Sequence, residues 1–224
     1  MLLDKKTISK LLAENKLSFD PNLDGFQLQP NSIDLRLGYS FYIPVSWKIN
    51  ENGRVAMSAD YLDYNAPQDK LQLIKLKPGQ YFEILPHEFI IISTLERITL
   101  NADDVAGNLQ PRSTALRRGL QITGGTIDVH YSGHLTIPIV NTTNHILRLY
   151  PGERICQLLL FKLNNPLTKE EASKHGLNAA KYMEATPYGL EAKSDSQEEI
   201  DFIKAGKIDE LKTNFNIQGG RQDV

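Results

Sequence analysis

The hydrophobic positions of the chain change their spacing twice. Between residues 3 and 12 the apolar side chains follow a helical spacing, and Asp4 stands where a helix N-cap is expected. This predicts a short amphipathic helix that ends near Asn15. From residue 32 to about residue 163, short runs of β-branched and aromatic residues alternate with Gly, Pro, Asn and Asp. Turn residues at intervals of about 8–15 positions are typical of an all-β domain.

Two kinds of strand are predicted in this β region. Residues 33–37 and 135–139 place apolar side chains at every second position, which favours strands with one buried face. Residues 89–92 and 155–161 are nearly continuous apolar runs, and we expect both of their faces to be buried. Closure into a barrel or jelly roll would remove the exposed edges of such strands. The predicted fold is therefore mainly β, a distorted barrel or jelly roll.

Two helices are expected near the C-terminus. Residues 168–183 are rich in Lys, Glu and Ala, and residues 196–215 place apolar side chains near one helical stripe behind a Ser-x-x-Glu capping box. We therefore divide the chain into a β domain with the N-terminal helix, residues 1–165, and a helical extension with a polar tail, residues 166–224.

The composition is that of an ordinary globular protein. Hydrophobic residues make up 41% of the 224 residues, charged residues 23%, and the formal net charge is −2. This charge gives no attraction to nucleic acid or to an anionic membrane, and we expect neither as a partner. The single cysteine, Cys156, excludes an internal disulfide, and no apolar run is long enough for a signal peptide or a membrane span. We therefore expect a cytoplasmic location.

Three polar clusters interrupt the β pattern. The first, residues 29–38, carries Asp34 and Arg36 on the face of a strand opposite to its apolar side chains. We predict that these two side chains form an ion pair that fixes a turn. Taken alone, the first cluster indicates structure more than function.

The second cluster, residues 110–119, concentrates hydrogen-bond donors that suit an anion. It holds three arginines, including Arg112 and Arg117, and the hydroxyl groups of Ser113 and Thr114, between a proline and a glycine. Guanidinium, hydroxyl and backbone N–H groups at this density can bind phosphate oxygens. A solvated basic turn is the alternative, because no G-x-x-x-x-G-K-[ST] loop is present.

The third cluster, residues 124–133, begins with two glycines that favour a tight hairpin. The spacing of Asp128 and Tyr131 lets one turn present both side chains to one pocket. A carboxylate beside a triphosphate can orient and deprotonate a water molecule, and a tyrosine ring can pack against a sugar. A turn-forming Asp is the common alternative. His130 and His134 are four positions apart, but they lie in a predicted turn and strand and not on a helix, so we expect them at the surface and not as zinc ligands.

In this order the clusters resemble the motifs of the superfamily of trimeric dUTPases and dCTP deaminases. Residues 29–38 resemble the opening motif of the deaminase branch, and residues 112–119 the shared phosphate motif. Residues 127–133 are similar to the shared sugar-and-water motif, and residues 151–158, Pro-Gly-Glu-Arg-Ile-Cys-Gln-Leu, to a fourth shared motif. The likeness covers residues 1–183.

The resemblance implies a role for individual residues. Asp128 would bind the 3′-hydroxyl and, in dUTPases, position the hydrolytic water, so it is the candidate catalytic residue. Tyr131 would pack under the deoxyribose, where a 2′-hydroxyl would clash. Phosphates would be contacted by Ser113, Arg117 and Gln157. The full set implied for substrate binding is Arg112, Ser113, Arg117, Ile127, Tyr131, Gln157, Lys181 and Tyr182, of which the last two come from a weaker match near the deaminase C-terminus.

The resemblance also implies a cofactor and an assembly. Mg²⁺ would bridge the phosphate oxygens, largely through water, and would not occupy an all-protein cage. The ligand would be a pyrimidine deoxynucleoside triphosphate, bound by a homotrimer in which three subunits share each site.

The two branches of the superfamily differ in where water attacks. In dCTP deaminases a glutamate on the strand after the shared Asp carries the protons of the deamination, and this sequence has Pro138 at that position. Proline cannot transfer a proton, and loss of a general acid or base costs about 10²–10⁴ in rate. We do not expect a zinc deaminase, because the sequence lacks the H-x-E and P-C-x-x-C elements that hold the zinc ion and its catalytic glutamate. We therefore expect hydrolysis of dUTP to dUMP and pyrophosphate, with Asp128 serving the water.

Two alternatives stay open. The chain could be a dCTP deaminase in which Glu83, Glu88 or Glu153 replaces the missing glutamate. It could also be a nucleotide-binding regulatory relative without turnover, whose C-terminal helices contact another protein. The arm with which dUTPases close over the triphosphate is not recognisable in this sequence.

Overall fold

The N-terminal helix forms where the apolar spacing predicts it. The computed structural model describes residues 1–57, 71–175, 178–179 and 195–217. Helix α1 (Lys5–Ala13) begins behind Asp4, whose carboxylate accepts a hydrogen bond from the backbone N–H of Thr7 at 2.8 Å. Ile8 is fully buried and anchors the helix to the rest of the molecule.

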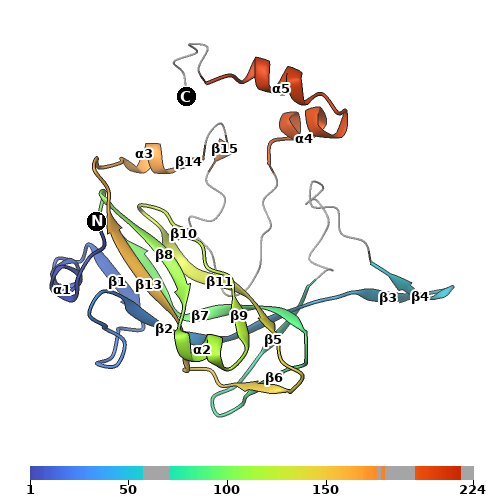
Figure 1. Cartoon of the computed structure of the whole chain (residues 1–224), viewed down its shortest axis with the longest axis horizontal. Helices are drawn as coiled ribbons and strands as arrows, with labels where there is room; N and C mark the ends of the chain where they lie inside the picture. Colours follow the sequence, from blue (N-terminus) through green and yellow to red (C-terminus); the bar gives the residue numbers. More distant parts are fainter. Residues whose placement is uncertain (58–70, 176–177, 180–194, 218–224) are drawn as a thin grey trace.

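A curled antiparallel sheet of nine strands forms the body of the protein, so the prediction of a mainly β fold is confirmed (Figure 1). Along the sheet the strands follow the order β10-β8-β13-β2-β7-β11-β9, with β1 also paired to β7 and β5 to β2. The strands of this sheet are β1 (Leu17–Asp20), β2 (Ile33–Pro44), β5 (Leu71–Lys75), β7 (Phe89–Leu100), β8 (Val105–Pro111), β9 (Leu120–Ile122), β10 (Thr126–Ile127), β11 (Ser132–Asn141) and β13 (Arg154–Lys162).

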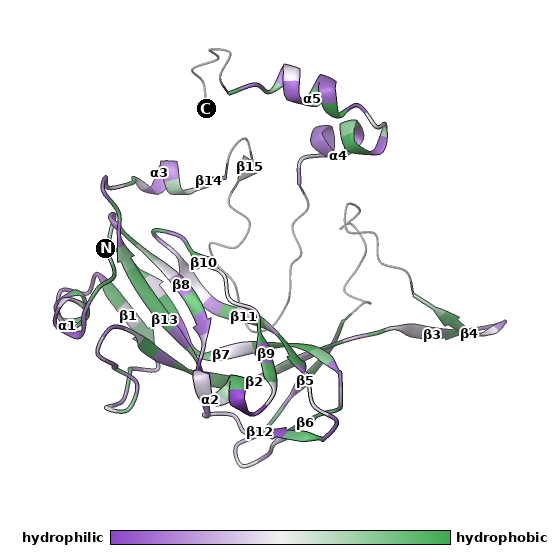
Figure 2. Ribbon diagram, viewed as in Figure 1, coloured by the Kyte–Doolittle hydropathy of each residue, from purple (hydrophilic) through white to green (hydrophobic). Residues whose placement is uncertain are grey.

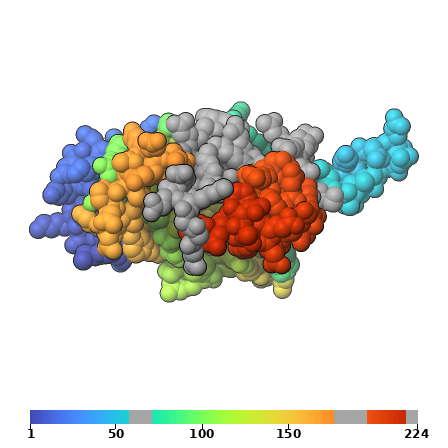
Figure 3. Space-filling model, turned by 90° about the horizontal axis from the view of Figure 1, so that it is seen from above, coloured from blue at the N-terminus to red at the C-terminus, as the bar shows by residue number. Residues whose placement is uncertain are grey.

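Three two-stranded ribbons flank the sheet. The ribbon of β6 and β12 packs against the core, where the rings of Phe41 and Phe82 stack with their centroids 4.5 Å apart. The hairpin of β3 and β4 projects from one end of the molecule (Figure 3). The ribbons consist of β3 (Trp47–Asn50) with β4 (Gly53–Ala56), β6 (Phe82–Ile84) with β12 (Leu147–Leu149), and β14 (Lys174–His175) with β15 (Asn178–Ala179).

The hydrophobic core lies against one face of the sheet, whose strands are largely apolar (Figure 2). Ile33, Leu35 and Leu37 of β2 are fully buried, as their alternation predicts. The prediction that residues 89–92 of β7 and residues 155–161 of β13 are buried on both faces is wrong for the isolated chain. Both strands alternate buried with half-exposed or exposed residues, because one face of the sheet meets the core and the other meets solvent.

The C-terminal helices are shorter than the sequence pattern predicts. The helix expected over residues 168–183 is a single turn, α3 (Lys169–Ala172), and the chain then extends into β14. The helix expected over residues 196–215 is divided into α4 (Gln197–Lys204) and α5 (Ile208–Asn214) by Gly206, whose φ of 69° suits a glycine at a helix end.

Two further expectations concern the chain as a whole. In the described residues, no helix has both the length and the apolar character needed to cross a membrane. The division into residues 1–165 and 166–224 stays a prediction.

Candidate active site

A tight turn after β10 presents Asp128. Ile127 is buried in the core, and the turn that follows is closed by a hydrogen bond from the N–H of Tyr131 to the carbonyl of Asp128 at 3.3 Å. His130 takes a φ of 64° within this turn. The carbonyl of Tyr131 accepts from the N–H of Leu100 at 2.8 Å, which ties the turn to the end of β7. The backbone of the third cluster is therefore held from both sides.

The carboxylate of Asp128 is open to solvent. Its side chain is 48% exposed, and its Oδ2 lies 3.1 Å from Nε2 of His175, which comes from β14. Sequence reasoning did not identify His175, because it lies outside the recognised motifs and in a segment whose composition predicted a helix. The carboxylate is thus both accessible to a ligand and partnered by an imidazole.

Tyr131 shares the turn with Asp128 but not its exposure. Its side chain belongs to the hydrophobic core and is 7% exposed, and its hydroxyl donates to the carbonyl of His134 at 2.9 Å. Burial raises the pKa of this phenol, so the ring stays neutral. The role of Tyr131 beneath a sugar stays a prediction.

The two glycines before the turn differ in what surrounds them. A Cβ atom on Gly124 would lie 2.0 Å from the carbonyl oxygen of Leu109, whereas a Cβ on Gly125 would have no heavy atom within 4 Å. The N–H of Leu109 donates to the carbonyl of Gly125 at 2.8 Å, so the backbones of this segment and β8 are in direct contact. The close approach of the Leu109 backbone therefore requires a glycine at position 124 but not at position 125. The sequence alone does not distinguish the two glycines.

We expect Gly124→Ala to lower the free energy of unfolding by about 1–3 kcal/mol, because the methyl group forces the segment away from β8. Gly125→Ala is the matched control and should change it by less than about 0.5 kcal/mol. Urea denaturation of both variants measures the difference. Equal effects at the two positions would contradict the close approach.

The second cluster folds into a one-turn helix, α2 (Ser113–Arg117), directly after β8. Ala115 is buried, while Ser113 and Arg117 are exposed. Within the part of the chain that the structure describes, the side chains of Ser113 and Arg117 have no hydrogen-bond or ion-pair partner. Both side chains are exposed to solvent, and their contact with phosphate stays a prediction.

Arg112 is engaged inside the protein. Its Nε lies 3.0 Å from Oδ2 of Asp34, and its Nη1 donates to the carbonyl of Arg154 at 2.8 Å. Arg154 Nη1 lies 3.1 Å from the same Asp34 oxygen. The guanidinium of Arg112 thus helps to fix the start of α2. Its predicted contact with substrate would have to use N–H groups other than those that bind Asp34 and the carbonyl of Arg154.

The predicted ion pair between Asp34 and Arg36 is wrong. Asp34 is buried and pairs with Arg112 and Arg154, whereas Arg36 pairs with Asp24 at 2.6 Å. The strand alternation placed Asp34 and Arg36 on one face. Instead, Asp34 pairs with Arg112 at the start of α2 and with Arg154 of β13, and Arg36 pairs with Asp24 in the loop before β2.

A buried carboxyl group completes this network. Glu96 is 1% exposed; its oxygens accept hydrogen bonds from Nε2 of Gln27 at 2.7 Å and from the backbone N–H of Arg36 at 3.0 Å. Burial raises the pKa of Glu96. Residues of the first cluster therefore connect the loop before β2 to strands β7 and β13 and stabilise the fold at this point.

Gln157 lies close to the phosphate cluster. On β13 it is directly opposite Asp34 of β2 and Gln110 of β8, and it is half-buried. The neighbouring Cys156 is opposite Pro111, the last residue of β8. Only Arg112 separates Pro111 from Ser113, where α2 begins. The strand register thus brings the fourth motif next to the second.

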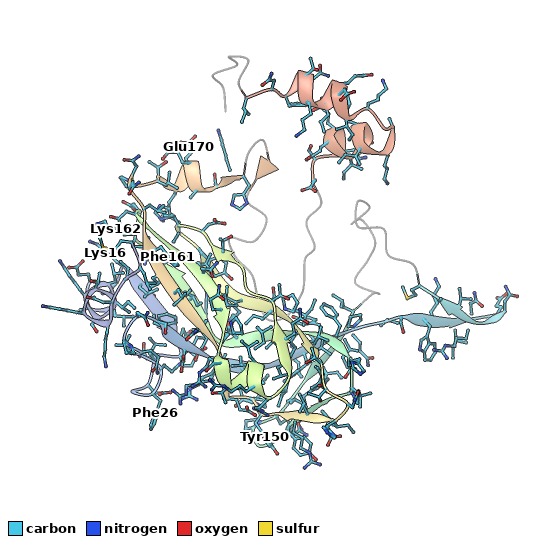
Figure 4. The ribbon with its side chains drawn as sticks, viewed as in Figure 1. Lys16, Phe26, Tyr150, Phe161, Lys162 and Glu170 are labelled. Carbon is cyan, nitrogen blue, oxygen red and sulfur yellow. The ribbon has the colours of Figure 1, made fainter. Side chains whose placement is uncertain are left out.

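The turn with Asp128 and the helix α2 lie toward opposite ends of β8. Ile127 pairs with Gly107 near the start of β8, whereas α2 follows Pro111. The four residue steps between these positions span roughly 13 Å at about 3.3 Å each. Figure 4 shows Glu170 of α3 above the sheet and Tyr150 below it, and Figure 1 shows α2 at the lower end of the sheet, away from α3. One chain does not bring the two clusters together.

Pro138 is half-buried on β11, opposite Ile91 of β7. Its carbonyl accepts from the N–H of Thr123 at 3.0 Å, just beyond the end of β9, where a proline costs few ladder hydrogen bonds.

The three carboxylates considered as replacements for the missing glutamate have partners elsewhere. Glu83 pairs with Arg148 at 3.0 Å, Glu153 pairs with Arg118 at 2.6 Å, and Glu88 accepts from the N–H of Leu85 at 2.7 Å.

Several predicted positions remain to be placed. Lys181 and Tyr182 lie outside the described residues. The prediction that His130 lies at the surface is wrong. Its side chain is 6% exposed, and its Nε2 lies 2.9 Å from the carbonyl oxygen of Leu167. His134 is half-buried, with Nδ1 3.1 Å from the carbonyl of Thr94. The assignment of Asp128 as catalytic, and of the binding residues, stays a prediction.

The family of the chain follows from its sequence and fold together. A family model described as dCTP deaminase-like matches residues 2–163, and the chain belongs to this family. Among its relatives is "dCTP deaminase, dUMP-forming" of Dictyoglomus turgidum, 34% identical over 179 residues that cover 79% of this chain and 88% of the relative. A protein of the same name from Clavibacter michiganensis is 34% identical over 206 residues, covering 91% and 93%.

A solved structure has the same fold. The 2′-deoxycytidine 5′-triphosphate deaminase from Agrobacterium tumefaciens superimposes with a TM-score of 0.54 and 24% identity, over 71% of this chain and 48% of that chain. The family model and the two relatives confirm the predicted membership of the dUTPase and dCTP deaminase superfamily.

Proposed function

We propose that the protein hydrolyses dUTP to dUMP and pyrophosphate, with Asp128 as the catalytic residue. The observation that carries the proposal has two parts. The carboxylate of Asp128 is open to solvent, and Pro138 stands where the family's deaminases have a proton-transferring glutamate. The relatives named dUMP-forming dCTP deaminases support it chemically. Conversion of dCTP to dUMP requires both loss of the amine and cleavage of the triphosphate. A chain without the deamination group retains the second reaction.

The hydrolytic step needs few groups from the protein. Asp128 orients a water molecule and accepts its proton as the water oxygen bonds to the α-phosphorus. The bond from that phosphorus to the bridging oxygen breaks, and pyrophosphate leaves with its electron pair. Ser113 and Arg117, which are exposed, and Gln157 hold the triphosphate oxygens and stabilise the charge that develops on them.

We propose that Mg²⁺ is the cofactor. Among the described residues, no group of three or more His, Cys, Asp or Glu side chains is arranged to hold a metal ion. An ion held mainly by phosphate oxygens and water needs no such group, and when bound it would neutralise charge on the triphosphate. The contribution of Asp128, Ser113 and Arg117 is to position the substrate around it.

We propose further that the active form is a homotrimer with shared sites. Asp128 and α2 lie at opposite ends of β8 in one chain, so one subunit would supply the carboxylate and a neighbour the phosphate donors. The outer face of β13 also carries Leu159 and Phe161, which are only half-buried in the isolated chain. Apolar strand positions of this kind favour contact with another subunit.

A second candidate function is deamination of dCTP, which the names of the relatives favour. Glu83, Glu88 and Glu153 each have a partner in the structure. Deamination would therefore require one of these three carboxylates to leave its partner, or another carboxylate to reach the base. One assay separates the candidates: the protein is incubated with dUTP or dCTP and magnesium, and pyrophosphate and ammonia are measured separately. Pyrophosphate from dUTP without ammonia from dCTP is expected. Ammonia from dCTP would favour deamination, and neither product would contradict both reactions.

Mixing two inactive variants tests the shared site. Arg117→Ala and Asp128→Asn chains should each lack turnover, but mixed trimers should recover it. In trimers assembled at random from equal amounts, a site meets both intact residues with a chance of one half times one half, so roughly a quarter of the wild-type rate is expected. Coexpression followed by the pyrophosphate assay measures it. A mixture as inactive as its components would contradict sharing.

A further inference from the structure

His175 contacts the carboxylate on which the proposed function depends. Its Nε2 lies 3.1 Å from Oδ2 of Asp128, and the two side chains are 47% and 48% exposed. Within the described ranges this imidazole is the side chain paired with Asp128. Because Oδ1 has no such partner there, one carboxylate oxygen is engaged and the other can meet a water molecule.

The segment that carries His175 is fixed to the body of the protein before it reaches Asp128. The N–H of Leu163 donates to the carbonyl of Asp104 at 2.7 Å, and the N–H of Leu167 to the carbonyl of Asp103 at 2.8 Å. Helix α3 then begins with a capping box between Thr168 and Glu171. β14 follows α3 directly, so little free chain separates His175 from these anchors.

The same turn holds this segment at a second point. The imidazole of His130, two residues after Asp128, is 6% exposed, and its Nε2 lies 2.9 Å from the carbonyl of Leu167. The buried contact at His130 anchors the segment, and the open contact at Asp128 lies where a ligand can reach it. Two contacts from one turn make the position of His175 a defined feature of the fold.

We propose that His175 is a positioning residue for Asp128, an inference that rests on the proposed function. In this role Nε2 of His175 carries the proton and, at 3.1 Å from Oδ2, holds the carboxylate in one rotamer. Oδ1 then faces the water that attacks the α-phosphorus. A half-exposed carboxylate without this donor would sample several rotamers, and a displaced base lowers the rate of the chemical step much more than it lowers substrate binding.

Substitution of His175 gives the first test. His175→Ala should lower kcat for dUTP roughly 10-fold, with KM changed less than about two-fold. His175→Gln retains an N–H donor and should restore most of kcat. His145→Ala, at an exposed histidine of the β11–β12 turn, is the matched control and should behave as wild type. Thermal denaturation of all three variants checks that they are folded. An unchanged kcat in His175→Ala, or no rescue by His175→Gln, would overturn the role.

A double-mutant cycle gives the second test. If His175 acts through Asp128, His175→Ala should change the residual rate by less than about two-fold in the Asp128→Asn background. A full 10-fold loss in that background would show that His175 acts elsewhere, and the inference would fail.

The two proposals fail in different ways. A wild-type protein that releases no pyrophosphate from dUTP refutes the proposed function and, with it, the positioning role of His175. A protein that hydrolyses dUTP but is indifferent to His175→Ala refutes the inference alone. Limited digestion by trypsin is a readout besides activity. Both His175→Ala and Asp128→Ala remove the contact and should expose Lys174 to faster cleavage, and unchanged cleavage in both would refute the contact itself.

Discussion

Asp128→Asn is expected to reduce dUTP hydrolysis about 10²–10⁴-fold while leaving the fold intact. The amide has the shape of the carboxylate but cannot accept the proton of the attacking water. Its carbonyl oxygen can still accept from Nε2 of His175, so the turn should keep its structure. Pyrophosphate release under saturating dUTP measures the effect.

The control for this prediction is another exposed aspartate. Asp209→Asn on α5 removes a carboxylate far along the chain and should leave turnover unchanged. The thermal midpoint of Asp128→Asn should match that of the wild type, because the side chain is half-exposed. Turnover of Asp128→Asn close to that of the wild type would remove Asp128 from the mechanism.

Asp34→Asn should lower the free energy of unfolding by about 3–5 kcal/mol. The Asp34 side chain is 3% exposed, and its Oδ2 faces two guanidinium groups, those of Arg112 and Arg154, at 3.0 and 3.1 Å. An amide leaves both cations without a counter-charge. Because the two arginines retain 24% and 28% exposure, water can reach them, and we expect a value near the lower end of this range.

The matched control is Asp24→Asn. Asp24 also pairs with an arginine, Arg36, but its side chain is 44% exposed, so its loss should cost less than about 1 kcal/mol. Urea denaturation of both variants provides the comparison. If Asp34→Asn costs no more than Asp24→Asn, the buried ion-pair network does not hold the first cluster together.

The elements that the sequence predicted well are those whose signal is local. Asp4 caps α1 because a helix start needs an acceptor within three residues, and the alternation of Ile33, Leu35 and Leu37 predicts one buried face of β2. The polar clusters were found for the same reason, since each is a continuous run. Their partners were not, because Asp34 pairs with side chains 78 and 120 positions away along the chain.

The C-terminal region shows the limit of composition as a guide. Lys, Glu and Ala favour a helix over residues 168–183, but after Ala172 the chain leaves the helix and extends along β14. Contacts of Leu167 with Asp103 and His130 fix the direction of this segment. Tertiary contacts therefore override a weak local preference.

By itself the sequence determined the class of fold and the order of the motifs, and it has Pro138 where the resemblance implies the glutamate of the deaminases, because these features depend on residue types and short-range spacing. Only the tertiary structure decided that Asp34 pairs with Arg112 and Arg154, that the Asp128 turn and α2 lie apart along β8, and that His175 meets Asp128. These features depend on strand register and on chain segments far apart in the sequence, and neither can be read from local periodicity.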